Sequence, residues 1–124
     1  MKKENLFSSN VPSTVNSQGV KANGFIFLTE IGKNPKTNEM EPGITAQAKR
    51  IMESAKTILD ENGSSLENLV KVTVYIADLE KAPMFNEVYY SYFRDEKSRP
   101  VRCCVQVAKL FPGFEVEVEF IALA

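Results

Sequence analysis

The stretch Ile44–Asn62 reads ITAQAKRIMESAKTILDEN, and its apolar residues recur three and four positions apart. That spacing places one apolar stripe along an α-helix, formed by Ala48, Ile51, Met52, Ala55, Ile58 and Leu59. Charged residues take the opposite side, and Gly63 follows, where a left-handed residue commonly ends a helix. The pattern therefore predicts a helix that packs its stripe against another layer of the molecule.

Strand patterns flank this helix on both sides. Upstream, Asn23-Gly24 is a strong hairpin signal between a short strand near Gln18–Ala22 and the apolar run Phe25–Leu28. Downstream, apolar and polar residues alternate over Leu69–Asp78, which predicts a strand with one buried face.

The rest of the chain completes an α+β pattern. A second helix is expected over Ala82–Phe93, with Pro83 in its first turn. Two more strands are expected over about Val101–Val107 and Glu115–Leu123, whereas residues 1–16 look like a loop. The order β-β-α-β-α-β-β predicts one mixed sheet with two helices packed on a single face. The length of 124 residues fits a single domain over 1–124.

Composition excludes several classes of function. The 15 Lys and Arg residues are offset by 16 Asp and Glu and form no long basic face, so neither a nucleic acid nor a membrane partner is expected. The absence of histidine excludes Ser-His-Asp and Cys-His catalysis and histidine-containing zinc sites. The sequence contains no nucleotide-binding motif, and we expect neither a cofactor nor a metal.

Two features favour the cytoplasm. No apolar stretch is long enough to span a membrane, and the basic start Met1–Asn5 is not followed by the apolar region of a secretory signal. The only cysteines, Cys103 and Cys104, are adjacent and would point to opposite faces of a strand, so a bond between them would be strained. Free thiols are typical of a reducing compartment.

Polar residues on the two C-terminal strands are the main candidates for chemistry. Two alternating sets each share a face of their strand: Arg102, Cys104 and Gln106 on the first, and Glu115, Glu117 and Glu119 on the second. If the strands pair as a hairpin, Cys104 lies across from Glu117 and Arg102 across from Glu119, on a polar face away from the helices. The same pattern is typical of a solvated strand face with cross-strand ion pairs, and pattern alone leaves both interpretations open.

Longer segments resemble a known family. The run Arg99–Leu110, RPVRCCVQVAKL, and then Glu117–Ala122, EVEFIA, closely resemble the C-terminal signature of the RidA/YjgF family, approximately P-x-R-x-C-V-x-V-A-x-L and E-x-E-x-I-A. Further agreement is found in four segments, Asn34–Thr37, Asn62–Leu66, Val70–Tyr75 and Phe85–Tyr89. The similarity covers almost the whole chain in order and spacing.

The resemblance implies a chorismate-mutase-like homotrimer with clefts between subunits. In such clefts, 2-aminoacrylate and related imino acids such as 2-iminobutanoate are hydrolysed to 2-oxo acids and ammonia. Carried over by residue, Arg102 would hold the substrate carboxylate, which a planar guanidinium can grip through two parallel hydrogen bonds. Glu117 would position the attacking water, and the backbone carbonyl of Cys104 would help to hold that water.

Two further positions are expected to line the cleft. At the family's Ser-Gly-Gln step this chain has Leu28-Thr29-Glu30, so Thr29 supplies a hydroxyl group. Glu30 is expected to add a negative charge near the mouth of the cleft. Where the family has an N-terminal tyrosine this chain has Asn16, which can form hydrogen bonds but offers no ring to cover a substrate.

Two alternatives to a deaminase remain open. The cleft could hold a small carboxylate without turning it over, which the changes at Thr29 and Asn16 favour. The family's names also carry a ribonuclease or translation-inhibitor activity, as in endoribonuclease L-PSP. The chain offers neither histidine nor a basic stripe for that chemistry.

Overall fold

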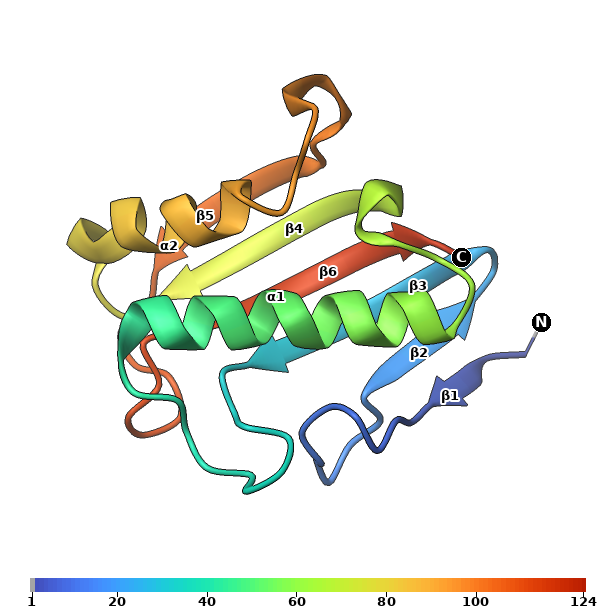
Figure 1. Ribbon diagram of the computed structural model, residues 1–124, viewed down its shortest axis with the longest axis horizontal. Helices are drawn as coiled ribbons and strands as arrows, with labels where there is room; N and C mark the ends of the chain where they lie inside the picture. The colour runs from blue at the N-terminus through green and yellow to red at the C-terminus, as the bar shows by residue number, and fades with distance from the viewer. Residues whose placement is uncertain (1) are drawn as a thin grey trace.

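The computed structural model describes residues 2–124, which form a six-stranded mixed sheet with two α-helices on one face (Figure 1). The fold class expected from the sequence is therefore confirmed. Short 3-10 turns precede β4, α2 and β5. In chain order the elements are β1 (Glu4–Leu6), β2 (Gly19–Ala22), β3 (Phe25–Ile31), α1 (Gly43–Glu61), β4 (Leu69–Ile76), α2 (Ala82–Tyr90), β5 (Val101–Gln106) and β6 (Val116–Leu123).

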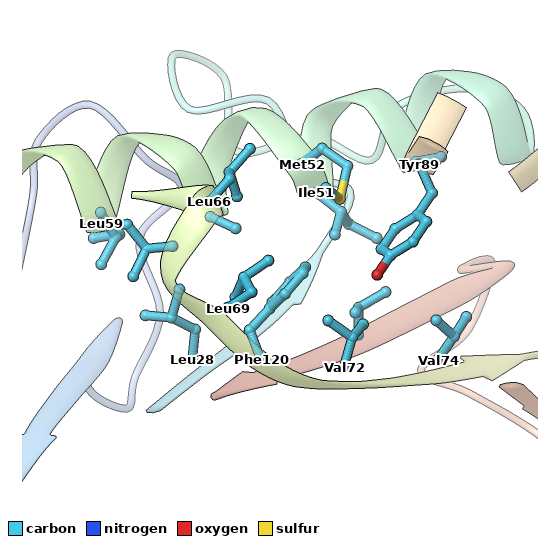
Figure 2. Close-up of a cluster of buried hydrophobic side chains, with 14 of the residues drawn as sticks. Leu28, Ile51, Met52, Leu59, Leu66, Leu69, Val72, Val74, Tyr89 and Phe120 are labelled. Atoms are coloured by element: carbon cyan, nitrogen blue, oxygen red, sulfur yellow. The ribbon is translucent and has the colours of Figure 1, made fainter. Parts of the chain in front are cut away.

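Helix α1 is held to the sheet by the apolar stripe that its sequence predicts. All six residues of the stripe are 0% exposed. Figure 2 shows Ile51 and Met52 on the side of α1 that faces Val72 of the sheet, and Leu59 on the side that faces Leu28. Each such side chain contributes about 1.5–3 kcal/mol when fully buried, so this contact dominates the core.

The local turns also follow the sequence. Asn23 and Gly24 have φ of +50° and +83°, the left-handed pair that a two-residue hairpin needs, and Ala22 pairs with Phe25 across it. Gly63, with φ of +78°, follows the end of α1 as expected.

The order of the strands, β1-β2-β3-β6-β4-β5, differs from the sequence expectation. Strand β6 lies between β3 and β4 and is antiparallel to both, whereas β5 is an edge strand parallel to β4. The predicted hairpin of β5 with β6 is therefore wrong. As a central strand, β6 buries every second residue, Val116, Val118, Phe120 and Ala122, and this burial outweighs pairing with its neighbour in sequence.

The ends of other elements also differ from expectation. Residues 4–6 form β1, which pairs with β2, although their sequence shows no periodicity. Strand β3 continues to Ile31, so Thr29 and Glu30 lie within a strand and not after it. Helix α2 ends at Tyr90, three residues before the expected end at Phe93. No helix within residues 2–124 has the length and apolar character to cross a membrane.

Candidate functional site

A pocket of about 300 Å³ lies beside the end of β3, where that strand extends beyond its paired stretch with β2. Four residues expected from the sequence line it together, namely Asn16 from the N-terminal loop, Thr29 and Glu30 from β3, and Glu117 from β6. The strand pairing places Thr29 beside Glu119 and Ile31 beside Glu117. This pocket, called the β3 pocket below, is the candidate site.

Glu117 has the environment of a general base. It lies between Ile31 and Tyr75 on the face of the sheet that carries no helix. Burial, followed by the nearby charge of Glu119, raises the pKa of Glu117 above its ordinary value. Glu119 accepts a hydrogen bond of 2.5 Å from the Tyr75 hydroxyl, whereas the Glu117 carboxylate has no such partner within residues 2–124. The Glu117 carboxylate can therefore accept a hydrogen bond from a water or a ligand.

Asn16 and Thr29 are both exposed at the pocket. The backbone N–H of Asn16 donates to the Thr14 hydroxyl at 3.2 Å, which fixes the loop but leaves the Asn16 side chain available. Both residues also border a hollow of about 740 Å³ that spreads over the helix-free face past Tyr75 and Cys103. The β3 pocket therefore opens onto a broad, accessible sheet surface.

Glu30 is among the residues that line the β3 pocket, as expected, but its side chain is buried. It follows Ile26 and Leu28 in the inward alternation of β3, and it is only 7% exposed. Burial raises its pKa to about 8, so this carboxyl group is mostly neutral at pH 7. Glu30 therefore adds little of the negative charge that was expected at the cleft, because its buried carboxyl group is mostly protonated at pH 7.

Arg102 and Cys104 do not line the β3 pocket within one chain. Parallel pairing sets Arg102 beside Val72 and Cys104 beside Val74, whose side chains are buried under the helices. The Arg102 guanidinium donates from Nη2 to Asn86 Oδ1 at 2.7 Å and lies 4.7 Å from the centre of the Tyr89 ring. The predicted face shared with Glu117 is thus wrong for a single chain, because β4 separates the two strands.

One polar atom of Arg102 and one of the neighbouring Tyr89 lack hydrogen-bond partners within residues 2–124. Arg102 Nη1 and the Tyr89 hydroxyl are buried without a hydrogen-bond partner among residues 2–124. Burial raises the pKa of Tyr89 to about 12, so it remains a neutral donor, although Arg102 partly opposes the shift. An unpaired buried polar group costs about 1–3 kcal/mol, and such groups commonly mark places that a ligand completes. A carboxylate would satisfy Nη1.

The two cysteines differ in their surroundings. Cys103 is exposed on the helix-free face, whereas Cys104 is half-buried on the other, and both are free thiols as expected. Burial is the main cause that raises the pKa of the Cys104 thiol, so the thiol stays protonated near neutral pH. That state argues against a thiolate nucleophile at Cys104.

Lys33 and Phe111 are among the residues of the β3 pocket that sequence reasoning missed. Phe111 belongs to the loop between β5 and β6, where an aromatic residue before Pro112-Gly113 fits no strand or helix pattern. An apolar ring at a turn that does not pack into the core could have indicated a binding residue. Residues 2–124 contain no group of three or more Cys, Asp or Glu side chains arranged to hold a metal ion.

Comparison with known proteins places this geometry in a family. A family model described as endoribonuclease L-PSP matches residues 8–124. A RutC family protein from Aquifex aeolicus is 41% identical over 114 residues, 91% of each chain. The 2-iminobutanoate/2-iminopropanoate deaminase of Escherichia coli is 31% identical over 122 residues, 95% of each chain.

Solved structures give the same result. RidA from the Antarctic bacterium Psychrobacter superposes with a TM-score of 0.91 at 32% identity, covering 98% of this chain and 99% of that one. Escherichia coli TdcF with bound serine superposes with a TM-score of 0.89 at 31% identity, covering 98% of both chains. The protein is thus an α+β domain of one sheet and two helices with a carboxylate-bearing pocket. It belongs to the RidA/YjgF family, also described as endoribonuclease L-PSP.

Proposed function

We propose that the protein is an enamine/imine deaminase that hydrolyses small 2-imino acids to 2-oxo acids and ammonia. The observation that carries the proposal is the unpaired, partly desolvated carboxylate of Glu117 in the β3 pocket. Such a group can orient a water molecule and accept its proton, which is the main requirement of this hydrolysis. The name of the Escherichia coli relative, a 2-iminobutanoate/2-iminopropanoate deaminase, supports the same reaction.

The proposal requires a second copy of the chain at each site. Within one chain, β4 separates Arg102 from Glu117, and the two side chains lie on opposite faces of the sheet. Strand β5 is at the sheet edge, and the helix-free face exposes the apolar residues Phe27, Val101 and Val105. We propose a homotrimer in which these surfaces are covered and Arg102 of one subunit faces Glu117 of the next.

The chemistry of such a cleft follows from its residues. Arg102 binds the substrate carboxylate, with Nη1 supplying a hydrogen bond that it lacks in the free chain. Glu117 takes one proton from water while the water oxygen bonds to the iminium carbon, giving a carbinolamine. Glu117 then returns this proton to the nitrogen. The carbon–nitrogen bond breaks, its electrons leave with nitrogen, and the hydroxyl proton is released to give the 2-oxo acid and ammonium.

Activity measurements test the reaction directly. The imine of 2-aminobutanoate can be generated in situ by an amino acid oxidase and its disappearance followed. We expect the wild-type protein to accelerate hydrolysis above the buffer rate, and Arg102→Ala and Glu117→Gln each to lower kcat/KM by about 100-fold or more. A folded wild-type trimer that leaves the buffer rate unchanged would overturn the proposal.

Mixing the two inactive variants tests whether the site is shared. When Arg102→Ala and Glu117→Gln chains are unfolded and refolded together, some clefts receive Arg102 from one chain and Glu117 from the other. For random trimers this is about one cleft in four, so about a quarter of wild-type activity should return. Each variant refolded alone is the control. If mixing restores nothing although mixed trimers form, the cleft is not built from two chains.

A further inference from the structure

Phe111 presents an aromatic ring at the β3 pocket. Its ring is 68% exposed, an unusual state for phenylalanine, yet it lies among the residues that line the pocket with Glu117 and Thr29. Nothing in the core requires a ring at this position, because the loop is anchored by Phe114 instead, which is 7% exposed.

The loop holds Phe111 in a defined place. The N–H of Phe114 donates to the Phe111 carbonyl at 3.0 Å, which closes a turn through Pro112 and Gly113. Gly113 has φ of +91°, and a Cβ there would lie 3.0 Å from the Met40 side chain, so the turn packs closely on the neighbouring loop. The two phenylalanine rings lie 6.1 Å apart between centres, at a tilt of 48°. The Phe111 ring therefore packs near the Phe114 ring and remains exposed at the β3 pocket.

The pocket around Phe111 combines an apolar side with a polar one. Pro12 and Ile31 line it together with Phe111, and its polar lining includes Asn16, Lys33 and Glu117. Where the family has an N-terminal tyrosine, this chain has Asn16, which provides no aromatic ring to cover a ligand. The aromatic cover of this pocket therefore comes from the loop between β5 and β6.

We propose that Phe111 determines specificity by covering the substrate's side chain, so that the cleft prefers imino acids with a branched apolar side chain over the alanine-derived imine. The inference rests on the proposed deaminase function and names its substrate class. An exposed ring gains by contact with an apolar group, whereas a single methyl group reaches little of it. The ring carries no group that binds a carboxylate or activates water, so replacing Phe111 should leave Arg102 and Glu117 able to perform their proposed roles.

The test compares two imines, derived in situ from leucine and from alanine, with the wild-type protein, Phe111→Leu and Phe111→Ala. In the wild type, kcat/KM should favour the leucine-derived imine. The ratio of the two kcat/KM values should fall about tenfold in Phe111→Ala, mainly through KM, and less in Phe111→Leu. Phe7→Ala is the matched control, because Phe7 is 70% exposed but borders a different hollow.

A binding measurement separates this inference from the proposed function. Thermal stabilisation by 4-methyl-2-oxopentanoate should exceed that by pyruvate in the wild type, and the difference should vanish in Phe111→Ala. If the wild type hydrolyses neither imine, the deaminase proposal fails, and this measurement still decides the role of Phe111. An unchanged ratio in active Phe111→Ala, or equal stabilisation of the wild type by the two acids, would overturn the inference.

Discussion

The burial of Glu30 costs the folded protein stability near neutral pH. Its carboxyl group is buried, and burial is the sole cause that raises its pKa from 4.5 to about 8. The folded state therefore keeps the proton at pH values where the unfolded chain has lost it. Between about pH 4.5 and pH 8 the unfolded state binds fewer protons, so stability must fall as the pH rises.

The replacement Glu30→Gln should remove this pH dependence. Glutamine keeps the shape of the neutral acid but cannot ionise, so the variant should be more stable than the wild type at pH 7, by about 3 kcal/mol. At pH 4 the two proteins should have nearly equal stability. Urea unfolding at several pH values between 4 and 8 measures both. Parallel stability curves over this range would show that Glu30 does not titrate between the folded and unfolded states.

At the scale of elements, the approach of α1 to the end of β3 depends on Gly32. A Cβ at Gly32 would lie 2.7 Å from the backbone Cα of Gln47, which cannot move without shifting the helix. The Gln47 side chain donates to the Glu41 carbonyl at 3.1 Å and accepts from the Glu115 N–H at 2.9 Å. These bonds hold together the loops around the β3 pocket.

Gly32→Ala should therefore destabilise the fold by about 1–3 kcal/mol, because added volume in a packed site forces the backbone to shift. The matched control is Gly19→Ala. Gly19 is also buried, but an added Cβ would meet the end of the flexible Leu28 side chain, so the cost should be clearly smaller. Urea unfolding compares the two variants. Equal losses would mean that the helix contact at Gly32 is not tight.

Elements set by neighbouring residues could be predicted from the sequence, whereas their order in the sheet could not. The stripe of α1 and the turn at Asn23-Gly24 depend on residues close in the chain, and both are confirmed. The pairing of β6 depends on β3 and β4, which precede it by many residues. Alternation over Glu115–Leu123 shows that one face is buried but not which strands lie beside it.

At the scale of the whole molecule, the helix-free face is the expected contact between subunits. Val105 lies on that face of β5 and is 44% exposed. Val105→Asp places a charge there, and desolvating that charge in an interface should prevent assembly. Light scattering should then report a monomer in place of a trimer.

Met84 provides the control for this prediction. It is 49% exposed, but it lies on α2, on the other side of the sheet. Met84→Asp should remain a trimer with unchanged deaminase activity. A trimeric Val105→Asp protein, or dissociation of both variants alike, would contradict the assignment of the helix-free face.

The candidate site could be predicted only in part, because its residues come from segments that lie far apart in the sequence. Asn16, Thr29 and Glu117 line one pocket as the resemblance implies, although no local pattern connects them. The expected position of Arg102, on the same face as Glu117, is wrong. Strand β5 pairs with β4, and the Arg102 side chain contacts Asn86 of α2. The role proposed for Arg102 requires a second chain, which sequence alternation cannot reveal. Phe111 was missed because loops carry no periodicity.

The central position of β6 has a consequence for how the protein is made. Strands β3 and β4 do not pair with each other, and only β6 joins them. While the chain emerges from the ribosome, the β1–β3 ribbon and α1 are complete long before Val116–Leu123 is available. The sheet can therefore close only after β6 has been made, so a nascent chain leaves two strand edges exposed until then.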